Sequence, residues 1–522
     1  MAATAPSSAF AVNRNVRSRL RLLAALGAVA GALAGVAAAQ LILGSAVAVA
    51  VLAAIAVAVA VWIAPWVGVV GLVAAGTLIE QFPLVAEGTY SDGTDHLVLF
   101  QSLNSGAGLG GIFATPFELF LGLLLLVWMA RGFANRSLRL PSSPLGLAIG
   151  AFALIVALGW VRGVTGGGSF QDSLLELRPW LYLTIAFLAA SQLITKPKHL
   201  TIMLVVLAAG IGIKGIQGVI TLASHVGSRP QAILAHEESF FFGLYIAILA
   251  GLWLLPIKGR LRMLMTVLFP FVLVSDIANQ RRTAWAIAAA VLVTIFIVCF
   301  LGFPQRRRMI AMFAVLGSVL AAIYWIGFSN DPGLLGQPAR AVLSQIAPSF
   351  RDQQSNQYRT IENVDLGIVI RQSTPFGTGF GHPIPQAVPN VDISNIDSFI
   401  SYLPHNGVLY VWLRLGVPGI VAFWLLICVA LMTATNGFRK RPNRVTLLIS
   451  MTVIAALVAY FVQGYYDMGL YWFRIAAVMG CLLGALEASR RFEKDQAVAE
   501  SPAAQRRLVR RGVGARDLRS AA

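Results

Sequence analysis

A histidine stands at the boundary between a long polar segment and an apolar run. The stretch Pro404-His405-Asn406-Gly407 closes the polar residues 329–404 and opens an apolar run over 408–432. An imidazole with an unperturbed pKa near ~6.5 can take up a proton near neutral pH, so this residue type suits a general base. The structural alternative for His405 is a hydrogen-bonded cap at the start of a helix.

Two adjacent arginines, Arg281 and Arg282, interrupt the apolar sequence in a short turn. Planar guanidinium groups hold phosphate oxygens with two parallel hydrogen bonds, which indicates an anion site. The structural alternative is that both side chains reach for lipid headgroups. The polar segment adds Arg359 and Arg371, which in isolation are typical of solvated loop charges.

Composition places these residues in a membrane protein. The 522 residues are 57% hydrophobic and 12% charged, and the mean hydropathy is +0.76. A membrane-crossing helix needs ~20 apolar residues, and about fourteen segments qualify on that rule. We therefore predict an all-α polytopic membrane protein with segments centred on 22–39, 45–63, 66–84, 116–132, 144–161, 179–194, 199–222, 239–255, 262–278, 284–302, 309–328, 405–432, 446–463 and 468–487.

Basic residues indicate the orientation of these segments. The net charge of +18 is spread over short clusters at alternate connections, which favours the positive-inside rule over nucleic-acid binding. We predict a cytoplasmic tail over 1–21, helices over 22–328, one large extracytoplasmic (periplasmic) loop over 329–404, helices over 405–487 and a basic cytoplasmic tail over 488–522. The clusters are Arg14, Arg17, Arg19 and Arg21; Arg131, Arg136 and Arg139; Lys196 and Lys198; Lys258, Arg260 and Arg262; Arg306, Arg307 and Arg308; and Arg439, Lys440, Arg441 and Arg444.

Charged residues inside the apolar segments need partners or a water-filled cavity. Lys214 is predicted to be an internal ion-pair partner or to line a cavity. Arg414 follows His405 within the same apolar run. It is predicted either to pair with Asp467 or Glu118, or to reach a phosphate group through a helix unwound near Gly416.

The polar segment and its end resemble the bacterial O-antigen ligase family and its polymerase relatives. In that family a periplasmic loop ends in a His-Asn pair that opens a transmembrane helix, and a Gly-x-x-Gly step follows. The stretch Gln280–Ala284 is similar to the family's Ser-Arg-Gly-Ala signature and aligns Arg282 with its arginine. The likeness extends over about residues 140–487 and rests on Arg359, Pro375-Phe376-Gly377-Thr378-Gly379-Phe380-Gly381, Pro404-His405-Asn406, Leu409, Gly416 and Gly419, with Leu177–Tyr182 as an early match.

The resemblance implies a GT-C-like enzyme in the bacterial inner membrane with both termini in the cytoplasm. Such an enzyme transfers a glycan from undecaprenyl pyrophosphate to a glycan or lipid acceptor hydroxyl at the outer face, for lipopolysaccharide or exopolysaccharide biosynthesis. It uses no metal or other cofactor and no nucleic acid, and attack opposite the leaving group inverts the anomeric centre. His405 would be catalytic, with Arg282 and Arg359 engaging the pyrophosphate. We add as candidate substrate-binding residues Arg281, Asn406, Arg371 and Arg414.

Two questions stay open from the sequence. It shows no motif that names the acceptor, so ligase and polymerase are not separated. A flippase for lipid-linked oligosaccharide is the alternative from another class, since glycine-rich spans and buried basic residues would suit it. Against the flippase, the chain shows no internal repeat of the kind common in transporters, and a transporter needs no His-Asn pair at the membrane edge.

Overall fold

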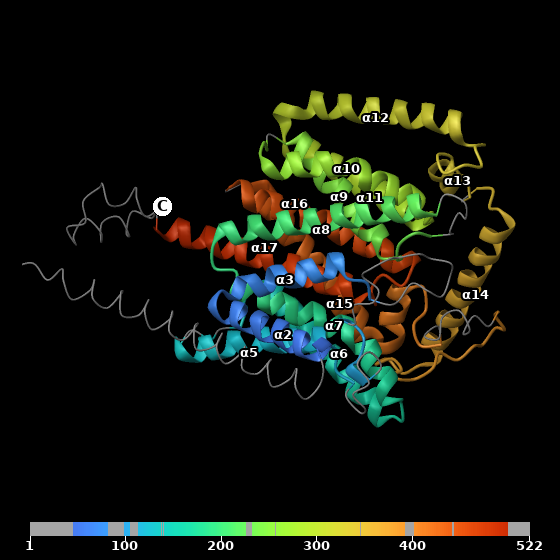
Figure 1. Cartoon of the computed structure of the whole chain (residues 1–522). Coiled ribbons are helices and arrows are strands. Elements are labelled where there is room, and N and C mark those ends of the chain that lie inside the picture. The colour runs from blue at the N-terminus through green and yellow to red at the C-terminus, as the bar shows by residue number, and fades with distance from the viewer. Residues whose placement is uncertain are drawn as a thin grey trace, which may run out of the picture.

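The computed structural model describes residues 45–81, 99–104, 113–136, 138, 140–225, 232–255, 257–344, 346–391, 401–440 and 443–499. Over these ranges the chain forms helices and no strand (Figure 1). The helices are α2 (Ser45–Ile63), α3 (Pro65–Leu78), α5 (Pro116–Ala134), α6 (Pro144–Thr165), α7 (Phe170–Leu193), α8 (Pro197–Ser224), α9 (Glu238–Leu254), α10 (Arg260–Ala278), α11 (Arg282–Gly302), η2 (Pro304–Arg306), α12 (Arg307–Phe328), α13 (Gln337–Leu343), α14 (Phe350–Gln372), α15 (Gly407–Lys440), α16 (Arg444–Tyr466) and α17 (Phe473–Ala499).

Within the described ranges, 9 helices are long and apolar enough to cross a membrane, and shorter apolar helices accompany them. The prediction of an all-α polytopic membrane protein is therefore confirmed. Every predicted apolar segment overlaps a described helix except 22–39, which lies outside the described residues.

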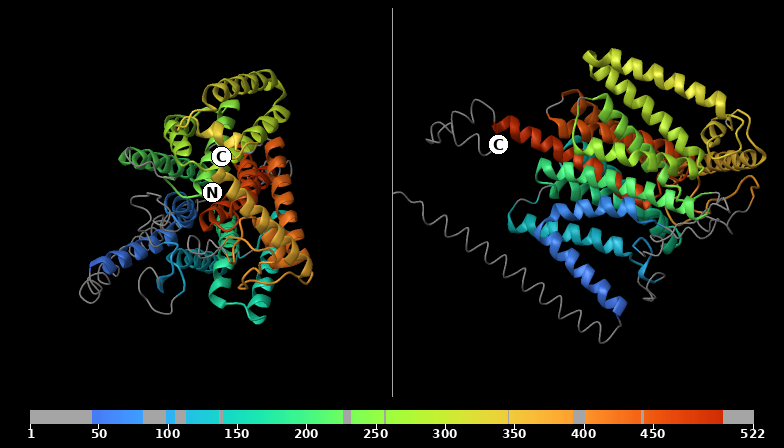
Figure 2. Two further views of the ribbon diagram at one scale, coloured as in Figure 1. Left: turned by 90° about the vertical axis from the view of Figure 1, so that its right-hand side faces the viewer. Right: turned by 45° about the horizontal axis from the view of Figure 1, so that its top comes forward.

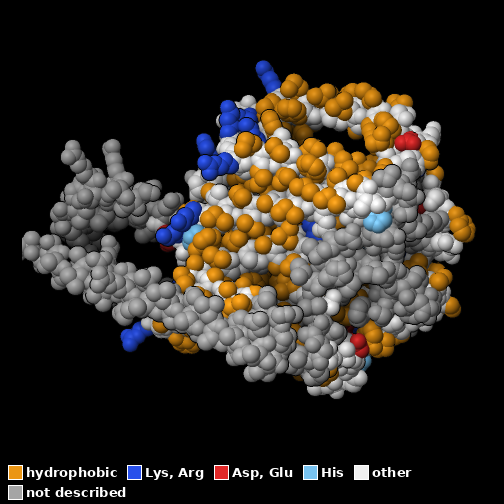
Figure 3. Space-filling model, viewed as in Figure 1, with side chains coloured by type: hydrophobic (Ala, Val, Ile, Leu, Met, Phe, Trp, Pro, Cys, Tyr) orange, Lys and Arg blue, Asp and Glu red, His pale blue; other side chains and the backbone are white. Residues whose placement is uncertain are grey.

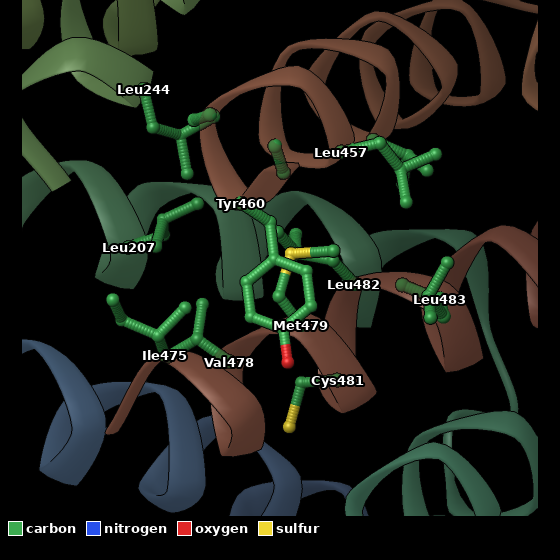
Figure 4. Close-up of a cluster of buried hydrophobic side chains, with 14 of the residues drawn as sticks. Leu207, Leu244, Leu457, Tyr460, Ile475, Val478, Met479, Cys481, Leu482 and Leu483 are labelled. Carbon is green, nitrogen blue, oxygen red and sulfur yellow. The ribbon is translucent and has the colours of Figure 1, made fainter. Parts of the chain in front are cut away.

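The centre of the bundle is built from the last two helices. Helix α17 packs along α7, and α16 packs against α9, α11 and α15. A Cβ added at Gly480 or Gly484 would meet the backbone of α7, so small residues four apart let these two helices approach closely. Around this contact, Tyr460 of α16 lies among apolar side chains of α8, α9 and α17 (Figure 4).

The polar segment folds into two helices at one end of the bundle, where the sequence predicted a loop. Helix α14 lies across the ends of the long helices in all views (Figures 1 and 2). The Ser349 hydroxyl accepts the N–H of Asp352 and caps its start. Leu366 and Val369 of α14 pack on Leu413 of α15. A mostly polar helix is thus held in place by a short apolar stripe.

Helix α15 is broken at Gly416, whose φ of 66° and ψ of −158° lie outside the helical region. The glycine-rich run 375–381 fits against this break. The N–H groups of Thr378 and Gly379 donate to the carbonyls of Leu413 and Arg414 at 2.8 and 2.9 Å, and Val417 N–H donates to Pro375 O at 2.8 Å. Positive φ values of 77°, 79° and 83° at Gly377, Gly379 and Gly381 permit this path. At Gly377 and Gly379 the run comes so close to the backbones of α15 and α6 that an added Cβ would collide with them.

The two ends of the bundle differ in charge. In Figure 3 hydrophobic side chains cover the sides of the helices, and Lys and Arg gather at the end away from α14. This basic end includes the starts of α10 and α12, with Arg260, Arg262, Arg307 and Arg308. The helix ends therefore divide into a basic side and a side that carries α14 and His405.

Candidate functional site

His405 lies two residues before the start of α15 and is held by an acidic side chain of α14. Its backbone N–H donates to Glu362 Oε2 at 3.0 Å, and its Nδ1 lies 3.2 Å from the same oxygen. The ring of Tyr358 meets the imidazole edge to face, with centroids 5.6 Å apart. The imidazole is 18% exposed. When Nδ1–H donates to the carboxylate, Nε2 of the neutral ring keeps its lone pair and can accept a proton.

The neighbouring Asn406 starts the helix. Its side-chain oxygen accepts the N–H groups of Val408 and Leu409 at 3.2 and 3.1 Å, and the residue is buried. This is the hydrogen bonding of a helix N-cap. The two residues of the His-Asn pair therefore have different contacts: Asn406 caps α15, and His405 contacts α14. A contact from the Asn406 amide group to substrate stays a prediction.

The paired arginines of the sequence lie at the same end as His405. Arg282 opens α11 and points at α14, where its guanidinium donates to Asn356 Oδ1 at 3.2 Å and to Ser355 Oγ at 3.4 Å. Its Nε lies 3.5 Å from Asp352 Oδ1, and its side chain is 21% exposed. Arg281 occupies the N-cap position of α11 directly before it.

Arg359 connects this arginine pair to the histidine along α14. In a helix, residues three apart share a face, so Arg359 lies beside Asn356 on one side and Glu362 on the other. One face of α14 therefore presents the Arg282 contact, Arg359 and the Glu362–His405 pair in succession. Arg371 is exposed in the last turn of the same helix, about 18 Å further along its axis.

A buried carboxylate lies opposite these cations. Asp467 follows α16, and one of its oxygens is 3.0 Å from His236 Nδ1. Burial by itself would raise the pKa of Asp467. The hydrogen bond and charge of His236, with the charges of Arg359 and His405, outweigh it and hold this pKa well below the usual range. Asp467 therefore stays ionised at neutral pH and balances part of the positive charge at the site. The next residue, Met468, donates its N–H to the His405 carbonyl at 2.9 Å.

Arg414 is placed apart from this group, and its partner differs from those predicted. The guanidinium is 1% exposed and pairs with Glu176 of α7, with Nη2 2.6 Å from Oε1. The same Nη2 donates to the carbonyls of His382 and Tyr402 at 2.6 and 3.2 Å. Each predicted partner is engaged elsewhere: Glu118 pairs with Arg178 at 2.8 Å and Asp467 with His236. Its Nη1 also donates to Thr378 Oγ1 at 3.3 Å, so Arg414 links α7, α15 and the glycine-rich run.

Further buried ion pairs support the same end of the bundle. Lys214 Nζ lies 2.8 Å from Glu80 Oε1 with both side chains fully buried, so the predicted internal ion pair is present. Arg474 lies 2.6 Å from Glu238, which places that acidic residue in the interior. In the described part of the chain, no cluster of three or more His, Cys, Asp or Glu side chains is placed to hold a metal ion.

The sequence did not single out Glu362 or Glu176. Glu362 lies three residues after Arg359, a spacing that has meaning only once residues 350–372 are known to be helical. Glu176 lies in an apolar segment 238 positions from Arg414, and no local pattern links the two. Tyr358 appears in the polar run as an ordinary aromatic residue, and only the fold brings it to His405.

The chain was compared with known proteins. Residues 268–424 match a family model described as O-antigen ligase. The match begins within α10 and ends within α15, so it contains His405, Glu362 and every residue that the sequence predicts for the site. Glu176 and Asp467 lie outside it. No curated protein matches the chain.

Proposed function

We propose, from the match of residues 268–424 to an O-antigen ligase family model, that the chain is a glycosyltransferase that moves a glycan from undecaprenyl pyrophosphate to an acceptor hydroxyl. The family match supports a ligase- or polymerase-type enzyme acting on a lipid-linked glycan in a membrane environment. The observation that carries the finer proposal is the His405 imidazole, partly exposed and held through Nδ1 by Glu362, which lies one helical turn after Arg359 on α14.

In the proposed reaction His405 is the general base. Its Nε2 takes the proton of the acceptor hydroxyl while that oxygen attacks the anomeric carbon. The bond from this carbon to the pyrophosphate oxygen breaks, and its electron pair leaves with undecaprenyl pyrophosphate. The proton then passes from the imidazolium to solvent or to the departing phosphate. Attack from the side opposite the leaving group inverts the anomeric centre.

Arg282 and Arg359 are proposed to bind the pyrophosphate. The leaving group gains negative charge as the bond breaks, and fixed cations near it stabilise that charge in the transition state. Arg282 is held by three side chains of α14, so its guanidinium is already oriented when the donor binds. With a good leaving group and two fixed cations, we propose that transfer proceeds without a metal ion.

The charge of the two bundle ends supports a location for this reaction. Basic residues gather at the end away from α14, and such residues favour the cytoplasmic side of a membrane. We therefore propose that His405 and α14 face the periplasm at the outer surface of the inner membrane. Both termini would then lie in the cytoplasm, with the polar segment 329–404 outside.

Replacing either arginine by lysine is expected to lower kcat/KM for the lipid-linked donor by about 10- to 100-fold. Lysine keeps the charge but cannot form two parallel hydrogen bonds with a phosphate group. The measurement is glycan transfer by purified Arg282→Lys and Arg359→Lys proteins in proteoliposomes over a series of donor concentrations. Arg439→Lys, at the basic end of the bundle, is the matched control and should behave as wild type. Unchanged donor kinetics in both site variants would remove the arginines from the proposed mechanism.

Glu362 is expected to act as a positioning residue for the base. Glu362→Gln should lower kcat by about 10-fold or more, because the amide orients the imidazole less strongly than the carboxylate does. Glu362→Asp, which keeps the charge on a shorter side chain, should recover part of the loss. The measurement is kcat for the three proteins at saturating donor and acceptor. A Gln variant with wild-type kcat would show that the contact between Glu362 and His405 has no role in transfer.

A further inference from the structure

A polar cleft opens beside the His405–Glu362 pair, on a side of α14 next to the side that carries Arg359. Its volume is about 250 Å³, and its polar lining consists of Tyr358, Glu362, Asp365, Gln386, Asn390 and Ser401. Pro404, the residue before the proposed base, also lines it. The cleft is therefore adjacent to the reacting end of the site.

The walls of the cleft are held by hydrogen bonds. Asp365 accepts the N–H of Val388 at 2.6 Å, and the Asn390 amide donates to the Tyr358 carbonyl at 3.1 Å. A backbone hydrogen bond of 2.7 Å from Ile384 N–H to the Ser401 carbonyl joins the two chain segments that face α14. The segments that form the cleft are thus fixed to α14 and to each other before any ligand arrives.

The chemistry of the lining excludes a phosphate group and favours a sugar. The described residues that line the cleft include two carboxylates, two amides, a hydroxyl and a phenol, and none of them is Lys, Arg or His. An anion would meet two carboxylates without a compensating cation. A sugar presents hydroxyl groups that can donate to carboxylates and pair with amides, and its apolar face can pack on Tyr358 or on the prolines. A volume below the ~300–1,000 Å³ of drug-sized sites suits one or two sugar rings.

The cleft and Arg359 lie on neighbouring sides of α14. Successive residues turn by about 100°, so Tyr358 and Asp365 share one side of the helix, and Arg359 lies on the neighbouring side. Glu362 lies between the two sides, four residues after Tyr358 and three after Arg359, and it carries the contact to His405. The histidine therefore stands at the border between a cation-bearing side and a cation-free side.

We propose that this cleft binds uncharged or amino-bearing sugar rings of a glycan substrate, while the pyrophosphate lies on the arginine side of α14. The inference rests on the proposed function, because it assigns the sugar rings and the pyrophosphate of one bound substrate to two different sides of α14. The rings belong either to the glycan attached to the carrier or to the acceptor. Both glycans present the same kind of hydroxyl groups, so steady-state kinetics with one substrate varied at a time are needed to distinguish them.

Two adjacent residues, one that lines the cleft and one that does not, supply a matched pair of variants. Gln386 lines the cleft, and its exposed neighbour Ala387 does not. Gln386→Trp should fill the space, whereas Ala387→Trp adds the same side chain outside it. Ser401→Trp fills the cleft from another chain segment and guards against a local defect in the first variant. Thermal unfolding of each purified protein checks that all three remain folded.

The first test is binding of the repeat oligosaccharide released by mild acid from the surface polysaccharide of the source cells. Titrated onto purified protein, it should bind wild type and Ala387→Trp equally and bind Gln386→Trp and Ser401→Trp at least 10-fold more weakly. Inorganic pyrophosphate should bind all four alike. Equal binding of the oligosaccharide to all four proteins would overturn the proposal. So would loss of pyrophosphate binding in the two cleft variants.

The second test is steady-state transfer with one substrate varied at a time. A rise in KM confined to the lipid-linked donor would place the transferred glycan in the cleft, and a rise confined to the acceptor would place the acceptor there. No rise for either substrate would contradict the proposal. The binding test also separates this proposal from the proposed function, because it requires no turnover. If His405 proves dispensable for transfer while Gln386→Trp still loses the oligosaccharide, the cleft assignment stands and the mechanism fails.

Discussion

His405→Gln is expected to lower the rate of glycan transfer by about 10³-fold, within the range that a positioned general base contributes. The backbone N–H of residue 405 still donates to Glu362, so one contact to α14 is preserved. It has no basic nitrogen to take the proton of the acceptor hydroxyl. The measurement is single-turnover transfer in proteoliposomes with saturating lipid-linked donor and acceptor.

The matched control is His225→Gln, which makes the same chemical change at the same end of the bundle. His225 caps α8 and bonds through Nδ1 to the Thr221 carbonyl at 2.9 Å, outside the proposed site. This variant should transfer glycan as wild type does. Binding of the donor should persist in His405→Gln, since the arginines are intact. If the variant kept full transfer, His405 would not be the general base of the reaction.

The second large effect concerns stability. Arg414→Met is expected to destabilise the folded protein by about 3–5 kcal/mol, the usual result of leaving one member of a buried ion pair without its partner. Glu176 is fully buried and would keep its charge in an apolar surrounding or take up a proton. The measurement is reversible unfolding in detergent micelles, followed by tryptophan fluorescence.

A double variant tests whether the effect comes from the orphaned charge. Replacing both partners, as Glu176→Gln with Arg414→Met, should recover a part of the lost stability, since no uncompensated charge is buried. Arg414 also donates to the carbonyls of His382 and Tyr402, so full recovery is not expected. Wild-type stability in the single Arg414→Met variant would contradict the assignment of this arginine to the framework of the site.

The sequence predicts the helices well and the polar segment poorly, for one physical reason. Helices that face lipid are recognisable in the sequence as long apolar runs, and nearly every such run is a helix in the structure. Helix α14 is mostly polar because it lies outside the apolar bundle, and its docking stripe of Leu366 and Val369 is too short to show a clear period. The helix that carries Glu362 was therefore not predictable from the sequence and is seen only in the structure.

The candidate site divides in the same way. His405, Arg282 and Arg359 can be named from residue type and family resemblance, and the fold brings them to one face of α14. The group that orients the base and the partner of Arg414 cannot be named, because these contacts join positions far apart in the chain. Arg371, predicted with the others, lies exposed at the far end of α14. It is therefore remote from the other predicted residues, and its role in binding stays a prediction.

The central claim is that glycan transfer requires His405 as the general base. A profile of the cellular glycans tests this claim most directly. A strain lacking the gene would be complemented with wild type, His405→Gln or His225→Gln, and its surface and carrier-linked glycans separated by size and mass. We predict that wild type and His225→Gln restore the mature glycan. In His405→Gln, long polymer left on the carrier would indicate a ligase, and single repeat units would indicate a polymerase. Full restoration of the mature glycan by His405→Gln, at wild-type protein level, would contradict the account.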